Sequence, residues 1–353
     1  MRHIVAVDMQ KKVVIVGGGF AGTYVARKLQ NHYSVTLIDS KDYFEFTPSV
    51  LRTIVEPQHI KKIQSKHSDY LQKTVLIREN VRRIGNGEVI TLTHAVTFDY
   101  LVICTGSSYR APLKDWNTIT ATRAQELVGY ADRLKQSNSV LVVGGGLVGV
   151  ELAAEIIGKY PSKKVTIIQA SNELIERNPI RARKYAYNFL SKRKVNMIFN
   201  EIVIGKQGRF YFTDKKRQLT ADIAFICTGI IPNSKHLKVF FRSSLDSRGF
   251  LKVNKFLQVG GFQNIFAAGD VTAILEEKTA QNAEKHAAAI AENIEALDLD
   301  RSMKEYVSKP RITVISLGKW NGIIVYKNLA IAGLMAAFAK WFVEWKTMID
   351  HKP

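Results

Sequence analysis

Two glycine-rich motifs of one kind, more than a hundred residues apart, constrain the fold of this chain more than any other feature. The first follows the apolar run VVIV and consists of Gly17, Gly18, Gly19, Phe20, Ala21 and Gly22. The second follows the apolar run VLVV and consists of Gly144, Gly145, Gly146, Leu147, Val148 and Gly149. A buried strand, a G-x-G-x-x-G turn and a helix in this order form the phosphate-binding unit of a dinucleotide-binding domain. The chain is therefore predicted to have an α/β fold with two Rossmann-type domains.

Each of the three motif glycines in the first turn is expected to have a physical role. Gly17 permits the tight turn from strand to helix, Gly19 leaves room for a pyrophosphate, and Gly22 lets helix and strand pack closely. The start of the helix offers unpaired N–H groups and the positive end of a dipole to the phosphates. Asp39 ends the next apolar run, 22 residues after Gly17, and is predicted to accept hydrogen bonds from a ribose. The corresponding glycines of the second motif are expected to take the same roles.

The second motif departs from the pattern at the ribose position. The run KVTIIQ after it ends in Gln169, where an acidic residue is expected. A neutral amide can hydrogen-bond a ribose without repelling a 2′-phosphate, so both NADH and NADPH remain open. Arg177, Arg181 and Arg183 follow, and the sequence does not show whether any of them reaches the nucleotide.

Three later segments extend the pattern. Two apolar runs end in Thr105-Gly106 and Thr228-Gly229, and the segment NIFAAGDVT contains Gly269-Asp270. This ordered set resembles the two-dinucleotide-binding flavoprotein reductases over about residues 11–295. The resemblance implies that the first motif binds FAD, that the second binds NADH or NADPH, and that Asp270 binds the ribitol chain of the flavin. It also implies a cofactor-binding role for the Thr-Gly pairs and for Ser40, Lys41, Pro48, Arg52, Val81 and Glu151.

Three further segments are similar to a narrower group. Residues 39–52, 277–294 and 344–348 resemble type II NADH:quinone dehydrogenases and the apoptosis-inducing-factor-like group that includes ferroptosis suppressor protein. The resemblance implies a quinone as electron acceptor and a helix over 277–294 that points toward the flavin. Lys278 is the predicted catalytic residue, because a cation there could stabilise reduced flavin or donate a proton to the quinone. The alternative is a solvated surface lysine.

The two cysteines, Cys104 and Cys227, sit in apolar segments and form no Cys-x-x-Cys pair. They are predicted to be buried thiols without a redox role, so the reduced flavin is expected to meet an external acceptor directly. The eight histidines show no ligand spacing, and no metal site is expected. No secretory signal is recognised, so the protein is not expected to be secreted. The start Met1-Arg2 does not match the Met-Gly signal for N-myristoylation.

The formal charge of +20 predicts attraction to anionic lipid, nucleic acid or phosphorylated cofactors. Residues 329–348 are predicted to form an amphipathic helix after two strands, too short in its apolar part to span a bilayer. Such a helix suits an anionic membrane surface, on the cytosolic face of a membrane or in mitochondria. A core helix or a homodimer contact is the alternative.

The predicted domains are an FAD-binding domain over residues 1–112 and 235–299, an NAD(P)H-binding domain over 113–234, and a small C-terminal α+β unit over 300–353. The predicted function is that of a membrane-associated, FAD-dependent NAD(P)H:quinone oxidoreductase. One alternative is a reductase of ferredoxin- or rubredoxin-type partners. Another is a DNA-binding redox protein like apoptosis-inducing factor, although no nucleic-acid-binding motif supports it. Sulfide oxidation is disfavoured because it needs sulfur-handling cysteines near the flavin.

Overall fold

The computed structural model describes residues 10–352 except 86, 110–117 and 121–122. Its first sheet has five parallel strands. In spatial order they are β20 (Ile265–Ala267), β9 (Tyr100–Ile103), β1 (Lys12–Val16), β2 (Ser34–Asp39) and β5 (Val75–Arg78). The strand β20 comes from far along the chain, after the whole second sheet. The predicted domain limits themselves stay a prediction.

The second sheet repeats this arrangement with five more parallel strands. They are β11 (Thr118–Thr120), β18 (Ile223–Ile226), β12 (Ser139–Val143), β13 (Lys164–Gln169) and β14 (Asn196–Phe199). The central strands of both sheets are almost completely buried, as expected where helices cover both faces of a parallel sheet. The predicted α/β fold is confirmed.

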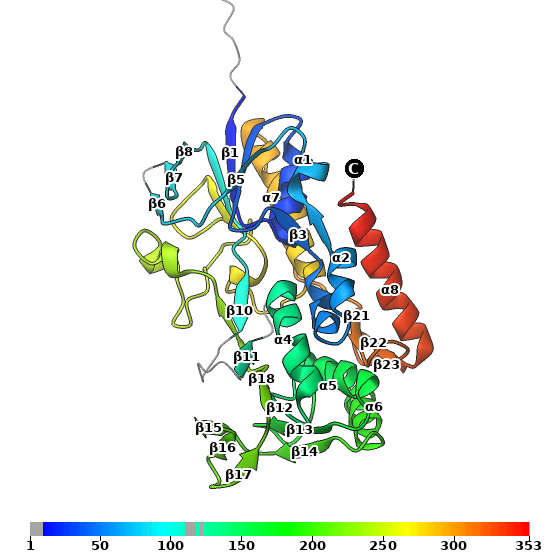
Figure 1. The fold of residues 1–353 in the computed structure, drawn as a ribbon. Helices are drawn as coiled ribbons and strands as arrows, with labels where there is room; N and C mark the ends of the chain where they lie inside the picture. Colours follow the sequence, from blue (N-terminus) through cyan, green and yellow to red (C-terminus); the bar gives the residue numbers. More distant parts are fainter. Residues whose placement is uncertain (1–9, 86, 110–117, 121–122, 353) are drawn as a thin grey trace, which may run out of the picture.

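Five longer helices pack on these two sheets. They are α1 (Phe20–Leu29), α4 (Ala124–Gln136), α5 (Leu147–Lys159), α6 (Ile180–Ser191) and α7 (Ala280–Asp298). Two of them, α1 and α5, begin at the glycine-rich turns. In Figure 1, α1 and α7 lie side by side although more than two hundred residues separate them. The helix predicted over 277–294 is present as α7, which begins at Ala280 and ends at Asp298, and the Thr279 hydroxyl before it accepts a hydrogen bond from the N–H of Asn282. Both helix starts can therefore face one cavity.

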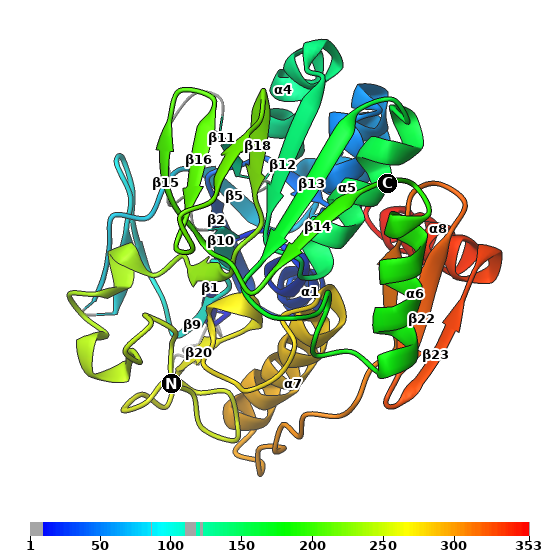
Figure 2. The ribbon, with the colours of Figure 1, turned by 90° about the horizontal axis from the view of Figure 1, so that it is seen from below.

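The C-terminal unit differs from the prediction in one respect. It consists of the antiparallel strands β21 (Thr313–Ser316), β22 (Gly322–Tyr326) and β23 (Leu329–Ala332), followed by α8 (Leu334–Ile349). Residues 329–332 were predicted to begin the helix, and this is wrong because they pair with β22 as a third strand. Gly333 ends the strand with a φ of 120°, a conformation that favours glycine, and the helix starts after it. Figure 2 shows α6, β22, β23 and α8 on one side of the molecule.

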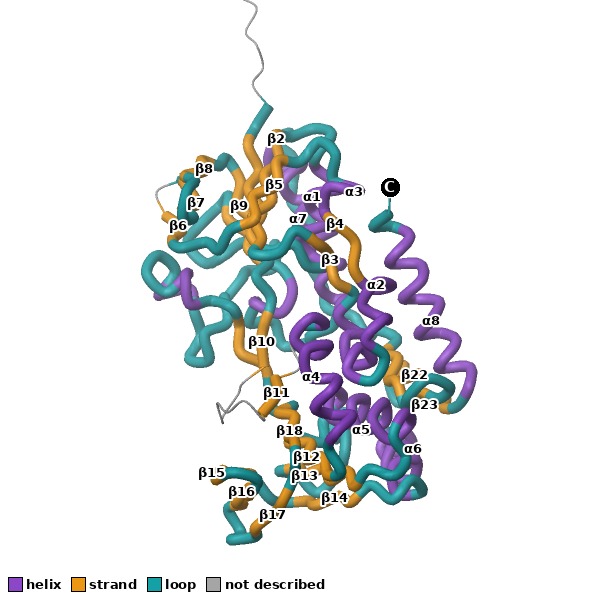
Figure 3. The backbone as a smooth tube through the Cα atoms, in the orientation of Figure 1, coloured by secondary structure: helices purple, strands orange, loops and turns teal. Residues whose placement is uncertain are grey.

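The remaining elements are short. The small antiparallel sheets are formed by β3 (Tyr43–Glu45) and β4 (Gln64–Lys66), by β6 (Arg83–Gly85), β7 (Glu88–Ile90) and β8 (Ala95–Thr97), by β10 (Ser107–Tyr109) and β19 (Ile230–Pro232), and by β15 (Val203–Gln207), β16 (Phe210–Thr213) and β17 (Gln218–Thr220). The short helices are η1 (Thr47–Ile54), η2 (Pro57–His59), α2 (Ile60–Ile63), α3 (His67–Tyr70), η3 (Lys235–Leu237), η4 (Arg242–Ser244) and η5 (Gly269–Val271). The sheet β6–β8 lies on the side of the molecule away from α8 (Figure 3).

Candidate functional site

The first glycine-rich turn joins β1 to α1. Gly17 has a φ of 104°, and a Cβ atom there would overlap the main-chain oxygen of Cys104. A Cβ atom on Gly22 would overlap the main-chain oxygen of Gly17, so the helix lies directly against the turn. At Gly19, by contrast, an added Cβ would meet no protein atom within 4 Å. The turn therefore needs two glycines for its own packing and leaves the third facing open space.

The second turn, between β12 and α5, has the same geometry. Gly144 has a φ of 108°, and a Cβ atom there would lie 2.6 Å from the main-chain oxygen of Cys227. Gly149 packs against Gly144 in the way that Gly22 packs against Gly17. At Gly146 an added Cβ meets no protein atom within 4 Å. Both turns are thus shaped to receive a ligand beside one glycine.

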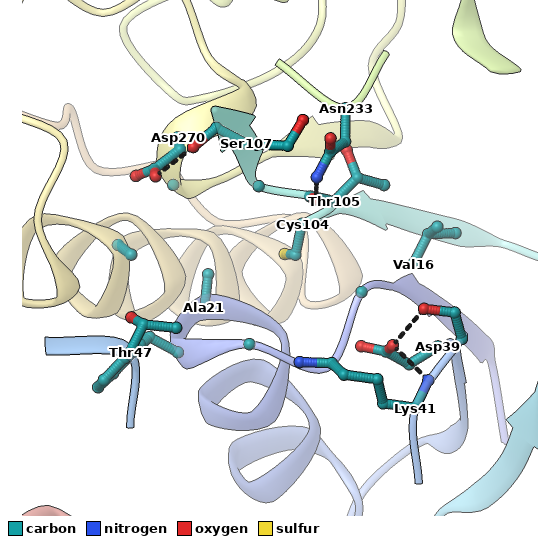
Figure 4. Close-up of a pocket in the computed structure, with 18 of the residues that line it drawn as sticks. Val16, Ala21, Asp39, Lys41, Thr47, Cys104, Thr105, Ser107, Asn233 and Asp270 are labelled. Atoms are coloured by element: carbon teal, nitrogen blue, oxygen red, sulfur yellow. Dashed lines mark hydrogen bonds between the residues drawn. The ribbon is translucent and has the colours of Figure 1, made fainter. Parts of the chain in front are cut away.

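A cavity of about 690 Å³ opens in front of the first turn. The structure brings thirteen of the predicted residues to its wall, which are Gly17, Gly19, Phe20, Ala21, Asp39, Ser40, Lys41, Val81, Thr105, Gly106, Gly269, Asp270 and Lys278. Figure 4 shows Asp270 and Ser107 on one side of this cavity and Asp39 with Lys41 on the other. Gly18, Gly22, Pro48 and Arg52 are not among the described residues that line it. The wall combines backbone at two glycine-containing turns with the charged side chains of Asp39, Lys41 and Asp270, which suits a ligand that carries phosphates and hydroxyls.

The cavity also contains residues that sequence reasoning missed. They are Val16, Ile38, Glu45, Thr47, Glu79, Asn80, Cys104, Ser107, Ser108, Arg123, Glu126, Asn233, His236, Ala268, Thr279, Ala280 and Ala283. Many of these lie directly beside predicted residues, so the strand ends themselves were the available signal. No sequence motif marked Asn233 as a cavity residue. Its side-chain amide donates a hydrogen bond to the main-chain oxygen of Thr105 at 2.9 Å, at the wall of the cavity.

The carboxylate of Asp39 closes the first turn. The N–H of Gly18 donates a hydrogen bond to its Oδ2, and the N–H of Lys41 donates to its Oδ1 at 2.8 Å. These donors hold the carboxylate at the end of β2, on the wall of the cavity. This is where the sequence pattern predicts the ribose of the dinucleotide.

The other end of the cavity is formed by Gly269 and Asp270. The hydroxyl of Ser107 donates a hydrogen bond to Asp270 at 2.8 Å, and burial raises the pKa of Asp270. Behind it, the N–H of Gly269 donates to Nδ1 of the buried His286 at 3.0 Å. His286 Nε2 lies 2.7 Å from Oε1 of Glu276. Because Nδ1 accepts a hydrogen bond, the ring proton is on Nε2, and this histidine holds the turn in place.

Lys278 lies beside Asp270 on the cavity wall. Its ammonium donates hydrogen bonds to the main-chain oxygens of Thr272 at 2.7 Å and Ile274 at 3.0 Å. Burial lowers the pKa of Lys278, and the nearby Asp270 carboxylate opposes this change. The residue is therefore a half-buried cation within the cavity rather than a solvated surface lysine. Its predicted catalytic role stays a prediction.

The second turn shows the amide of Gln169 in the place that Asp39 takes in the first. Its Oε1 accepts a hydrogen bond from the N–H of Gly145 at 2.8 Å, and its Nε2 donates to Ser171 Oγ at 2.7 Å. Leu147 and Val148 begin the helix that follows, and Thr228 and Gly229 follow the neighbouring strand β18. These predicted residues thus gather around one edge of the second sheet. Their binding of NADH or NADPH stays a prediction.

Two predicted cofactor-binding residues, Arg52 and Glu151, make buried protein contacts, and their predicted role stays a prediction. Arg52 pairs with Glu155 of α5 at 3.1 Å, and both side chains are less than a tenth exposed. Glu151, one turn earlier on α5, accepts a hydrogen bond from the N–H of Ser316 at 2.6 Å. Burial raises the pKa of Glu151. These contacts join α5 to η1 on one side and to β21 on the other.

Both cysteines are free and buried. Burial raises the pKa of the Cys104 thiol well above its usual range and that of Cys227 to about 12. Neither is poised as a thiolate, so the prediction of buried thiols is confirmed. Among the described residues there is also no cluster of three metal-ligating side chains, and no helix is long and apolar enough to cross a membrane.

Comparison with known proteins shows the family to which this chain belongs. A sequence profile described as pyridine nucleotide-disulphide oxidoreductase matches residues 11–287. Apoptosis-inducing factor homolog B of Dictyostelium discoideum is 34% identical, covering 96% of this chain and 95% of its own. Ferroptosis suppressor protein 1 of Mus musculus is 32% identical, covering 97% of this chain and 96% of its own.

Solved structures show the same fold at lower identity. The sulfide:quinone oxidoreductase from Aquifex aeolicus has a TM-score of 0.84 at 20% identity and covers 97% of this chain and 91% of its own. NDH2 from Plasmodium falciparum in complex with NADH has a TM-score of 0.83 at 15% identity and covers 98% and 99%. The chain belongs to the pyridine nucleotide-disulphide oxidoreductase family, as a flavoprotein enzyme that binds FAD and oxidises NADH or NADPH.

Proposed function

We propose that this enzyme is an NAD(P)H:quinone oxidoreductase in which FAD occupies the cavity before the first glycine-rich turn. The observation that carries the proposal is the fit of that cavity. The space beside Gly19 is open, and the buried hydroxyl of Thr105 lacks a hydrogen-bond partner among the described residues. A buried polar atom without a partner is rare in a folded protein, and a bound polar ligand would supply one.

The cavity residues suggest how FAD would be held. The backbone at Gly19 would receive the pyrophosphate, Asp39 the ribose, and Asp270 the ribitol chain. FAD supplies the redox chemistry, accepting electrons from the nicotinamide and passing them to the second substrate. The protein supplies binding, orientation and charge, with the cation of Lys278 next to Asp270 at the cavity wall.

The choice of a quinone rests on two arguments. The described residues hold no cysteine pair, because Cys104 and Cys227 are both free and buried, so a disulfide relay to a thiol substrate lacks its chemical groups. The structural neighbour from Aquifex aeolicus is itself named for quinone reduction. A quinone, which can take two electrons directly from the flavin, agrees with both arguments.

The experiment that tests this function is steady-state oxidation of NADH and NADPH by the purified yellow protein with a panel of quinones. We expect rapid turnover with quinones and slow turnover with a ferredoxin or rubredoxin. Fast reduction of the iron–sulfur partner together with inert quinones would replace the proposal with the reductase alternative. DNA retention that depends on salt, without quinone turnover, would favour the DNA-binding alternative.

We also propose that α8 places the enzyme on an anionic membrane surface, on the cytosolic face of a membrane or in mitochondria. An apolar stripe of side chains, each between 46% and 74% exposed, follows one face of the helix and comprises Met335, Phe338, Phe342, Trp345 and Ile349. In Figure 1 this helix runs along the outside of the molecule. Trp320 adds a half-exposed ring beside Trp341, and Lys319 lies over Trp320 at 5.3 Å. Aromatic and cationic side chains around an apolar helix face are typical of interfacial binding.

We expect the triple substitution F338S, F342S and W345S to weaken binding to vesicles containing phosphatidylserine by more than about tenfold, since each buried aromatic contributes more than 1 kcal/mol. Flotation of the holoenzyme measures this. Activity with a short, water-soluble quinone should remain, while activity with a long-tailed quinone in vesicles should fall. The control is V239S, which removes an apolar side chain that is 83% exposed elsewhere.

Two results would contradict the membrane proposal. Unchanged flotation of the triple variant would remove α8 from the membrane contact. A wild-type dimer that becomes a monomer in the variant, without any vesicle binding by either, would make the stripe a homodimer interface instead.

We expect Lys278→Met to keep FAD but to lower turnover with a quinone by roughly 10- to 1,000-fold, the scale of losing one electrostatic or proton-transfer group. Lys278→Arg is the control that keeps a charge. If the lysine acts as a cation, wild-type turnover should fall as pH rises through its lowered pKa, because the proton is then lost. That alkaline fall should move to higher pH in Lys278→Arg, since arginine stays protonated. Near-normal turnover of Lys278→Met would leave the residue with only its contacts to Thr272 and Ile274.

A further inference from the structure

A chain of hydrogen bonds leads from the second glycine-rich turn to the backbone of Glu173, whose side chain belongs to an ion pair. Gln169 Nε2 donates to Ser171 Oγ at 2.7 Å, and Ser171 Oγ donates to the main-chain oxygen of Glu173 at 3.1 Å. The carboxylate of Glu173 is paired with the guanidinium of Arg183, in the first turn of α6. The segment that follows β13 therefore carries one member of this ion pair, Glu173, four residues after Gln169.

The two glycine-rich turns have equivalent side chains at the position expected for the ribose. In the first, Asp39 at the end of β2 accepts a hydrogen bond from the N–H of Gly18. In the second, Gln169 at the end of β13 accepts one from the N–H of Gly145 at 2.8 Å. The two side chains hold equivalent places, so Gln169 faces the ribose of a nucleotide bound at the second turn.

The residues that follow these two side chains are equivalent as well. Lys41, two positions after Asp39, lines the first cavity. The residue two positions after Gln169 is Ser171, which carries the hydrogen-bonded chain to Glu173. A 2′-substituent on the ribose would therefore be directed toward the segment from Ser171 to Glu173.

Arg183 is a cation suited to a phosphate but already engaged. Its side chain is 26% exposed, and its buried Nε has no hydrogen-bond partner among the described residues. Arg177 is 78% exposed, and its guanidinium lies 3.8 Å from the carboxylate of Glu277. A phosphate binds a guanidinium through two parallel hydrogen bonds, and a carboxylate competes for the same donors. While Glu173 holds Arg183, a 2′-phosphate meets a negative charge first.

We propose that the Glu173–Arg183 ion pair makes this enzyme prefer NADH to NADPH. The 2′-hydroxyl of NADH needs only the neutral groups of Gln169 and Ser171. The 2′-phosphate of NADPH must instead displace Glu173 from Arg183 or lie beside an unneutralised carboxylate. The selectivity thus comes from the carboxylate of Glu173, which repels a 2′-phosphate and also pairs with the Arg183 guanidinium that could bind it. This inference rests on the proposed binding of the nicotinamide nucleotide at the second turn.

The test measures the dissociation constants of NAD⁺ and NADP⁺ for the holoenzyme by calorimetry, and the rates at which NADH and NADPH reduce the bound flavin without oxygen. Wild type should favour the nucleotide without the 2′-phosphate. Glu173→Ala should raise the NADP⁺ to NAD⁺ affinity ratio by roughly tenfold, the scale of one partly exposed charged contact. Adding Arg183→Ala to Glu173→Ala should remove that gain, because the freed guanidinium is then lost.

The controls are Asp132→Asn, which neutralises an exposed acid on α4, and Lys184→Ala, which removes an exposed cation next to Arg183. Both should leave the ratio within twofold of wild type. Glu173→Gln keeps the shape of the side chain and gives a second measurement should Glu173→Ala fold poorly. A wild-type preference for NADP⁺, or an unchanged ratio in both Glu173 variants, would overturn the inference while leaving the proposed function intact. A gain that survives the loss of Arg183 would overturn the role of that residue, and a wild type that binds neither nucleotide would overturn both proposals.

Discussion

Gly19→Val should yield a protein that folds but loses FAD, with affinity reduced by at least tenfold. An added Cβ at this position meets no protein atom within 4 Å, so the valine side chain enters the cavity without disturbing the protein around it. It then occupies the space that the pyrophosphate needs, and overfilling such a space costs about 1–3 kcal/mol or more. The ratio of flavin absorbance to protein absorbance after desalting measures the loss.

Two matched substitutions make this result specific. Gly158→Val places the same side chain at an exposed glycine of α5 that also has no neighbour within 4 Å, and this variant should stay yellow. Gly146→Val should keep FAD but raise the KM for NADH steeply, because it fills the corresponding space at the second turn. A Gly19→Val protein with full flavin content would refute the assignment of the first turn to FAD. Loss of both nucleotides in Gly146→Val would refute the division between the two turns.

The second large effect is expected at the ion pair between η1 and α5. Arg52→Met should lower the free energy of unfolding by about 3–5 kcal/mol, because it leaves the Glu155 carboxylate buried without its partner. The two side chains are 7% and 6% exposed, so water cannot replace the lost contact. Urea unfolding of the holoenzyme with excess FAD measures the change.

The double variant Arg52→Met with Glu155→Met is the informative comparison. It removes both charges and replaces them with apolar side chains of similar length, so its stability should return most of the way to wild type. Glu292→Gln, which breaks an ion pair whose side chains are 73% and 54% exposed, should change stability by less than about 1 kcal/mol. Additive losses from the two single Arg52 and Glu155 variants would show that the residues do not act as a pair.

The unpredicted contacts share a feature with this ion pair. Arg52 and Glu155 are 103 residues apart in the chain, and the family resemblance implied only a cofactor-binding role for Arg52. Glu151 likewise meets the backbone of Ser316, 165 residues further on. The connection of His286 to Gly269 and Glu276 was missed, because nothing in a helix sequence tells which turn its buried histidine supports.

Local sequence determined the two glycine-rich turns, their strands and the buried cysteines, and the family resemblance identified the Gly269-Asp270 segment. The local features follow from patterns within a few residues. An apolar run marks a buried strand, and the spacing of the glycines marks the turn and the helix packed on it, where a Cβ atom on Gly22 would overlap the main-chain oxygen of Gly17. Tertiary structure alone decided that residues 329–332 pair with β22 as a strand, that Lys278 lies within the cavity wall, and that Glu173 holds Arg183. The physical reason is that strand pairing and the partners of long charged side chains depend on which distant elements the packed sheets bring together.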